Sequence, residues 1–97
     1  MKKKNILLID ILAQDDINQA YQWYQEQQDG LGEDFLNSLE NAFNRICKTP
    51  NGFQQIKNHR QYPLKHFPFV ILYEHIDNKI FIDAVFHTSR NPTSKRV

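Results

Sequence analysis

Two stretches of the sequence decide the fold: RQYPLKHFPFVILY at residues 60–73 and DAVFHTSRNP at residues 83–92. They hold most of the β-branched and aromatic residues of the chain, which fit a pleated, half-buried strand. The residues between them are interrupted only by Asp77 and Asn78, a pair that tolerates the positive φ angles of a tight turn. We therefore predict one antiparallel hairpin that turns at Asp77 and Asn78.

A two-residue turn also sets the register of the hairpin. Ile76 then pairs with Lys79, and Leu72 pairs with Asp83. The face expected to meet the helices is almost entirely apolar and comprises Phe67, Phe69, Ile71, Tyr73, Ile80, Ile82, Ala84 and Phe86. The opposite face is mixed and comprises Pro68, Val70, Leu72, Glu74, Phe81, Asp83, Val85 and His87. So much apolar surface on an open face predicts a partner or another chain element over it.

Length and composition indicate one small domain. The chain has 97 residues, 40% of them hydrophobic and 12% aromatic, so its core can be filled without disulfides or metal. The single cysteine, Cys47, excludes an intrachain disulfide and is expected to be a buried structural thiol in a reducing compartment. No segment approaches the roughly 18 consecutive apolar residues of a membrane span, and no cleavage site follows the lysines at residues 2–4. We therefore expect a cytoplasmic protein without a membrane partner.

A strand and a first helix are predicted before residue 30. Residues 4–12 contain the apolar run ILLI, which is typical of a strand buried on both faces. Asp15 or Asp16 can then cap a helix by accepting from the N–H groups of its first turn. The apolar residues of one helical face follow at steps of three and four: Ile17, Ala20, Tyr21 and Tyr24.

A second helix leads into the hairpin. Gly30 can take the left-handed conformation that ends the first helix, and the second runs through Cys47 and ends before Pro50. The order of elements predicts an α+β fold, with an N-terminal strand and an antiparallel helical hairpin packed on a small, mainly antiparallel β-sheet. We expect residues 1–97 to form this single domain, with residues 93–97 as a mobile tail.

No generic enzyme or metal motif is present. The sequence has no Gly-rich phosphate loop, HExxH, CxxC or GxSxG. Its four histidines do not pair at ligand spacing on one helix: His59, His66, His75 and His87. We therefore expect neither a metal nor a cofactor.

A group of basic residues is the candidate target-binding site: Arg60, Lys65, His66, His87 and Arg90. The predicted pairing places Pro68 opposite His87, which brings Lys65 and His66 near Arg90. Convergent cations can hold phosphates, stabilise a phosphorane in RNA cleavage or dock an acidic partner segment. A solvated basic sheet edge has the same pattern, and the net charge of +1 does not by itself indicate nucleic-acid binding. For acid–base cleavage, His87 and His66 are the proton-transfer candidates, with Asp83 orienting His87.

An ordered series of residues extends over nearly the whole chain. It consists of Ala13-x-x-Asp16-Ile17-x-x-Ala20-x-x-Trp23-Tyr24, Gly30-Leu31-Gly32-x-x-Phe35-Leu36, Pro50, Arg60-x-Tyr62-Pro63-Leu64-Lys65-x-Phe67-Pro68-Phe69-Val70-Ile71-x-Tyr73 and Val85-x-His87-x-x-Arg90-Asn91-Pro92. In this order the series strongly resembles the RelE/ParE toxins of type II toxin–antitoxin systems. The resemblance implies a compact toxin encoded with an antitoxin, whose disordered segment folds on binding and wraps the helices and the sheet edge. It also implies that operator DNA is contacted only through the antitoxin.

The resemblance implies one of two activities. RelE-like members cut mRNA in the ribosomal A site with sheet-borne Lys and Arg and a C-terminal Tyr or His, whereas ParE-like members poison DNA gyrase and are not nucleases. Here Val70 stands where RelE-like enzymes place a catalytic Arg, and neither Tyr nor His follows His87. A methyl surface at Val70 would leave a phosphate unpaired. We therefore expect a ParE-like toxin that inhibits DNA gyrase, of the kind that serves plasmid or genome maintenance.

Two alternatives stay open from the sequence. A ribosome-dependent mRNA endoribonuclease, with the ribosome and mRNA as partners, would use Lys65, His87 and Arg90 as catalytic residues. An inactive homologue would only bind its antitoxin and co-repress the operon. Trp23 and Tyr24 are expected to pack in the core and the helix rather than to stack on a nucleobase.

Overall fold

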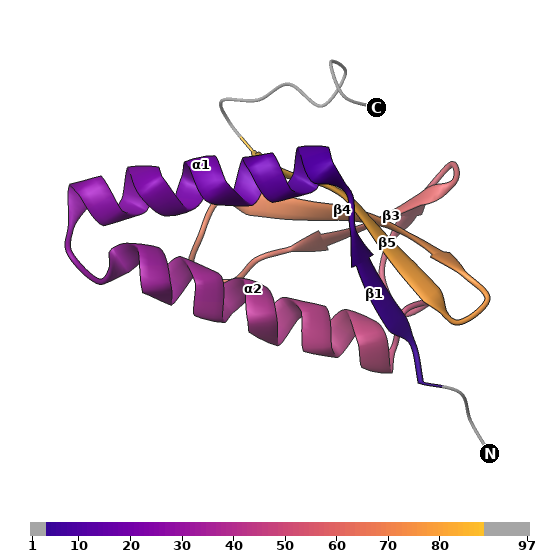
Figure 1. The fold of residues 1–97 in the computed structure, drawn as a ribbon. Coiled ribbons are helices and arrows are strands. Elements are labelled where there is room, and N and C mark those ends of the chain that lie inside the picture. Colours follow the sequence, from indigo (N-terminus) through magenta and orange to yellow (C-terminus); the bar gives the residue numbers. More distant parts are fainter. Residues whose placement is uncertain (1–3, 89–97) are drawn as a thin grey trace.

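The computed structural model describes residues 4–88, and in this range two helices cover one face of a five-stranded sheet (Figure 1). The elements in chain order are β1 (Ile6–Ile9), α1 (Ile11–Gln27), α2 (Leu31–Lys48), β2 (Gln55–Ile56), β3 (His59–Pro63), β4 (Phe69–Ile76) and β5 (Lys79–His87). The strand order is β1-β5-β4-β3-β2, with β1 parallel to β5 and the other pairs antiparallel. The predicted α+β architecture is confirmed. The predicted tail, residues 93–97, lies outside the described range. Among the described residues, no helix is long and apolar enough to cross a membrane.

The first helix begins earlier than the sequence predicts. Asp10 is its N-cap, and the Oδ1 atom of Asp10 accepts a hydrogen bond from the Leu12 N–H at 2.8 Å. The prediction that Asp15 or Asp16 caps the helix is wrong, because both lie inside it. Asp16 instead reaches β5, where its Oδ2 atom accepts from the Val85 N–H at 3.1 Å.

The two helices meet at a glycine joint. Gly30 has a φ of +91°, the left-handed conformation predicted for it, which glycine adopts without steric cost. Gly32 lies against α1, and its N–H donates to the Oε1 atom of Gln25 at 3.0 Å. A Cβ atom at Gly32 would lie only 2.9 Å from the ring of Tyr21. The close approach of the helices therefore depends on the small size of Gly32.

Strand β1 lies at the edge of the sheet, so the prediction of a strand buried on both faces is wrong. Among the described strands it pairs only with β5. Ile6 is 49% exposed, Leu8 41% and Ile9 38%, and Ile11 at the start of α1 is 75% exposed. An apolar run shows that a segment favours a strand, but it does not show which neighbours cover that strand.

The hairpin of β4 and β5 turns where the sequence predicts. Asp77 has a φ of 56°, and the strands pair from Ile76 and Lys79 onward. The predicted register holds as far as the pair formed by Tyr73 and Ile82. The turn residues are therefore sufficient to fix this half of the hairpin.

A β-bulge changes the register of the other half. Leu72 pairs with Ala84, so the prediction that it pairs with Asp83 is wrong, and Asp83 becomes the extra residue. Beyond the bulge the two faces exchange: Val85 packs in the core beneath the helices, whereas Phe86 and Ala84 lie on the opposite face. The predicted faces of these three residues are therefore wrong. Exposure does not distinguish the two faces, because Val85 and Phe86 are both buried, at 1% and 3% exposed. The exchange is evident because Val85 packs in the cluster beneath the helices and Phe86 in the cluster on the opposite face.

The buried apolar side chains form two clusters. The larger lies between the helices and the sheet and consists of Ala13, Ile17, Ala20, Tyr24, Phe35, Leu39, Ala42, Ile46, Tyr62, Leu64, Phe69, Ile71, Tyr73, Ile80, Ile82 and Val85. The smaller lies on the face without helices and consists of Leu72, Ala84 and Phe86, with Val70 packed against it. Removal of this apolar surface from water is the main driving force for the fold.

Candidate functional site

Lys65 and His66 lie in the loop between β3 and β4, and both side chains are exposed. The Leu64 N–H closes the loop by donating to the Phe69 carbonyl at 2.9 Å. The hydroxyl of Ser38, on α2, donates to the Lys65 carbonyl at 3.3 Å. The fold therefore presents the amine and the imidazole to solvent from a loop that is anchored to α2.

His87 ends β5 on the side of the sheet that the helices cover. It pairs with Phe69, one residue along from its predicted partner, and the two rings meet edge to face with centroids 5.2 Å apart. His87 borders a hollow of about 350 Å³ to which α1 contributes Asp16 and Trp23. The prediction that Asp83 orients His87 from the same face is wrong, because the bulge puts the two side chains on opposite faces.

Arg60 makes contacts inside the fold. Its Nη1 atom donates to the Phe53 carbonyl at 2.9 Å, which ties β3 to the segment that follows α2. Arg60 pairs with Tyr73 on β4, whereas His87 pairs with Phe69, four residues away on the same strand. Four residues of strand correspond to roughly 13 Å. Arg60 and His87 therefore lie at different levels of the sheet.

The described members of the basic group do not share one hollow. Lys65 and His66 lie beside α2, and His87 lies beside α1. Arg90 lies outside the described residues, so its approach to Lys65 stays a prediction. The functional roles of all five residues also stay predictions.

An open groove of about 750 Å³ lies between α2 and the loop that carries Lys65. Three of its lining residues are buried and apolar: Ala42, Tyr62 and Leu64. Charges of both signs surround them, among them Asp34 and Lys65. Such a surface suits an amphipathic peptide segment better than a phosphate group, because it offers apolar contacts and both signs of charge.

Two conspicuous aromatic residues occupy different environments. Tyr24 packs in the core as predicted. Its ring meets the Phe67 ring edge to face, with the centroids 5.0 Å apart, and its centroid lies 5.3 Å from that of Phe35. Trp23 is 43% exposed, so the prediction that it packs in the core is wrong. Its ring contacts the Tyr24 ring edge to face, with the centroids 5.1 Å apart.

Cys47 is half-buried and packs against the main core. Burial raises the pKa of its thiol, which disfavours the nucleophilic thiolate. Its backbone carbonyl accepts a hydrogen bond from Asn5 Nδ2 at 2.7 Å. These contacts favour the structural role predicted for Cys47.

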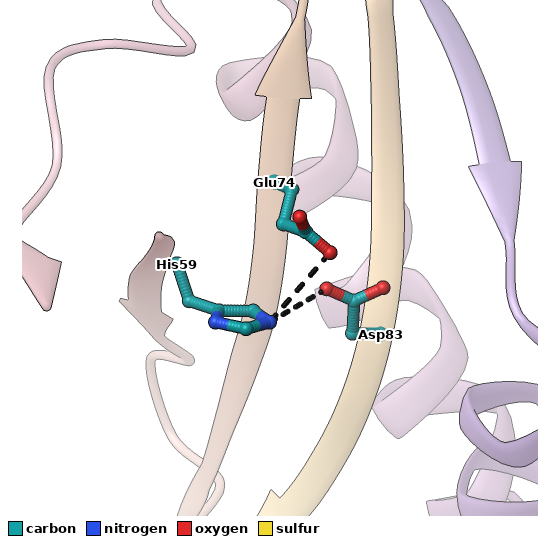
Figure 2. A group of neighbouring side chains, drawn as sticks. All are labelled: His59, Glu74 and Asp83. Atoms are coloured by element: carbon teal, nitrogen blue, oxygen red, sulfur yellow. Dashed lines mark ion pairs between the residues drawn. The ribbon is translucent and has the colours of Figure 1, made fainter. Parts of the chain in front are cut away.

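Three potential metal ligands gather on the face of the sheet without helices: His59 on β3, Glu74 on β4 and Asp83 on β5 (Figure 2). The Nε2 atom of His59 lies 3.1 Å from Asp83 Oδ2 and 3.6 Å from Glu74 Oε2. Both contacts are ion pairs, drawn as dashed lines in Figure 2. Within residues 4–88, Asp83 Oδ2 is a buried atom without a hydrogen-bond partner. All three side chains remain partly exposed, so water can reach the group.

The surroundings raise the pKa of Asp83 from 3.8 to about 7. Burial is the largest cause, followed by a hydrogen bond with Glu74 and by the negative charges of Glu74 and Asp10. Two carboxylates this close repel each other unless a proton or a cation lies between them. The group is therefore suited to hold a positive charge.

The sequence does not predict this group, because its members belong to three strands and the bulge decides which way Asp83 points. The signal available in the sequence is that Glu74 and Asp83 are isolated acidic residues within otherwise apolar strands. Such residues carry a desolvation cost, which favours a partner nearby.

Comparison with known proteins places the chain among the toxins of type II toxin–antitoxin systems. A family model described as "ParE toxin of type II toxin-antitoxin system, parDE" matches residues 7–92, and the chain therefore belongs to the ParE toxin family. The fold is similar to a solved chain described as "Chromosomal ParDE TA system from P. aeruginosa", with a TM-score of 0.78 and 14% identity. The match covers 89% of this chain and 98% of that chain. No curated protein sequence matches the chain significantly.

Proposed function

We propose that this ParE toxin arrests growth by interfering with DNA gyrase and that a cognate antitoxin neutralises it. The observation that carries the proposal is the match of the ParE family model to residues 7–92, which spans nearly all of the described fold. In the proposal, Lys65, His87 and Arg90 contact the target, with Arg60 and His66 in support.

The surroundings of Val70 support a protein target over an RNA substrate. Val70 is half-buried and packs against the smaller apolar cluster, next to Leu72 and Phe86. A phosphate held against this surface would have no cation to pair with, which is strongly unfavourable.

The edge of the sheet supports an antitoxin partner. Strand β1 presents exposed apolar side chains at Ile6, Leu8 and Ile9, next to the exposed Ile11 of α1. An exposed apolar edge strand favours pairing with a strand from another chain, because its N–H and C=O groups and its side chains then leave water together. We propose that the antitoxin covers this edge and extends towards the groove beside α2.

Supercoiling of relaxed plasmid by purified gyrase, with the full chain added in increasing amounts, tests the target. We expect inhibition that rises with the amount of chain and is weakened in a Lys65→Ala variant, because that amine is exposed and free to contact a partner surface. Lys79→Ala is the matched control, since Lys79 is also exposed but lies at the hairpin turn, outside the predicted site. Undisturbed supercoiling at saturating chain would contradict the gyrase proposal.

Two further measurements separate the alternatives. Primer extension on translated mRNA should show no cuts between A-site codon positions, and the appearance of such cuts would favour the endoribonuclease. Induction of the gene without its antitoxin should arrest growth. Normal growth under full expression would instead favour an inactive homologue that only binds antitoxin.

Binding between the chain and the antitoxin encoded with it tests the proposed edge. A Leu8→Glu variant should bind at least about tenfold more weakly, because a buried, unpaired carboxylate replaces an apolar contact. Gln27→Glu introduces the same charge at the exposed last residue of α1, at the other end of the helix from β1, and should bind normally. Equal affinities for both variants would exclude β1 from the interface.

A further inference from the structure

We propose that His59, Glu74 and Asp83 form a binding site for one divalent cation of the zinc class, on the face of the sheet that the helices leave open. The site is distinct from Lys65 and His87. It does not depend on which target the toxin has.

The spacing of the three donor atoms matches a tetrahedral ion. Zinc binds nitrogen and oxygen ligands at about 2.0–2.2 Å, so two ligands of a tetrahedral site lie roughly 3.4 Å apart. Here His59 Nε2 lies 3.1 Å from one carboxylate oxygen and 3.6 Å from the other, and the three donor atoms all lie within 4.8 Å of one another. Small side-chain rotations are therefore enough to place one ion between them.

The sheet holds the donors in place. His59, Glu74 and Asp83 come from three adjacent strands, and their side chains point towards one another in Figure 2. The β-bulge adds Asp83 as an unpaired residue of β5, directly after the pair of Tyr73 and Ile82. Because both of those side chains are fully buried, the backbone on either side of the site is firmly packed.

The donor set favours zinc over the hard cations. One imidazole and two carboxylates supply a borderline nitrogen and two negative charges, which balance a divalent ion. Magnesium and calcium prefer six or more oxygen ligands, and this group supplies too few. Partial exposure of the site leaves room for a water molecule as the fourth ligand.

A bound ion would also bond directly to the buried Oδ2 atom of Asp83. A buried polar atom without a partner is costly, and such atoms are rare in folded proteins. Within the described chain Asp83 Oδ2 is buried and makes no hydrogen bond, and its contact with His59 Nε2 is an ion pair at 3.1 Å. A cation between them would replace this contact with direct bonds to both atoms and would join β3, β4 and β5 on their open face.

Calorimetric titration of the full chain with zinc chloride, after removal of metal with a chelator, tests the site. We expect one ion per chain and a melting temperature that rises with zinc concentration, since an ion that binds the folded state stabilises it by mass action. In Asp83→Asn we expect zinc affinity to fall at least about tenfold, because even groups outside the ligand shell contribute 10- to 100-fold. The metal-free variant should fold at least as well as the parent, because the change removes a repelling carboxylate.

Two variants and two other metals sharpen the test. His59→Gln should also lose zinc, whereas His66→Gln, which removes an exposed imidazole outside the group, should bind like the parent. Cobalt should give the intense visible bands of a tetrahedral site in the parent and lose them in Asp83→Asn. Magnesium at the same concentration should leave the melting temperature unchanged.

Three results would overturn the proposal. These are absence of zinc binding to the parent chain, zinc binding that survives both Asp83→Asn and His59→Gln, and a larger stabilisation by magnesium than by zinc. Circular dichroism of each variant establishes that it is folded. If Asp83→Asn does not fold, His59→Gln and the cobalt spectrum of the parent decide the outcome.

Discussion

The Oδ2 atom of Asp16 on α1 accepts a hydrogen bond from the backbone N–H of Val85 at 3.1 Å, just beyond the bulge in β5. A β-bulge leaves backbone groups outside the regular ladder, and here the first helix satisfies one of them. This contact joins two segments that are far apart in the sequence at the point where the hairpin changes register. The helix therefore supports the bulge that turns Asp83 towards His59.

Replacement of Asp16 by Ala should destabilise the fold by about 1–3 kcal/mol, because the Val85 N–H loses its acceptor in a partly buried position. Urea denaturation followed by circular dichroism measures the effect. Asp15→Ala is the matched control, since Asp15 is an exposed neighbour on the same helix, and it should change stability by no more than about 0.5 kcal/mol. Equal losses of stability in the two variants would show that the hydrogen bond to Val85 does not stabilise the fold.

A methyl group at Gly32 should push the two helices apart. In Gly32→Ala the new Cβ would lie 2.9 Å from the Tyr21 ring and 2.8 Å from Gln25 Oε1, so crowding of about 1–3 kcal/mol exceeds the gain in helix propensity. The midpoint of thermal unfolding should fall accordingly. In a Tyr21→Ala background the same change should cost less, and an undiminished cost there would contradict crowding as the cause.

Removal of the Tyr73 hydroxyl should leave a carbonyl unpaired. That hydroxyl donates to the Pro50 carbonyl at 2.6 Å, and the ring is fully buried, so Tyr73→Phe should cost about 1–3 kcal/mol. Burial raises the pKa of Tyr73 from 10.0 to about 12, partly offset by Arg60, so an alkaline absorbance titration of the folded chain should show its ionisation well above pH 10. Tyr21→Phe is the control, because no hydrogen bond from its hydroxyl is present within residues 4–88. A similar loss in both variants would argue against the bond to Pro50.

In the metal-free chain, the contribution of Asp83 to stability should fall as pH rises from about 4 to about 7. Asp83 has a pKa of about 7 in the folded chain and 3.8 as its ordinary value, so between these values the folded state keeps a proton that the unfolded state has released. The part of the free energy of unfolding that Asp83 contributes then falls with rising pH. The groups that face Asp83 are His59 on β3, Glu74 on β4 and Asp10 before α1.

Denaturation with chelator present, at several pH values, checks this prediction when the free energies of unfolding of the parent and of Asp83→Asn are compared. Between about pH 4 and pH 7, the free energy of unfolding of Asp83→Asn should fall less, or rise more, with pH than that of the parent. Above pH 7 the variant should be more stable than the parent. Glu74→Gln removes a neighbouring negative charge, so it should move the transition of Asp83 to lower pH. Identical pH profiles for the parent and Asp83→Asn would refute the raised pKa.

Local chemistry explains which predictions from the sequence are confirmed. Gly30 takes the left-handed conformation because the chain must reverse there, and Asp77 takes a positive φ because the hairpin needs a two-residue turn. The periodic apolar residues of α1 and α2 are buried because a helix brings every third or fourth residue to one face. These features depend on residues that are close in the sequence.

The sequence by itself determined the helical hairpin, the β4–β5 turn and the resemblance to toxins, because each rests on local spacing or on the order of short motifs. Only the tertiary structure decided that β1 is an edge strand, since an apolar run does not specify its neighbours. Only the tertiary structure placed the bulge beside Asp16, and with it the opposite faces of Asp83 and His87. The physical reason is that strand register is a relation between distant segments, and a single residue added to one strand reverses every side chain beyond it.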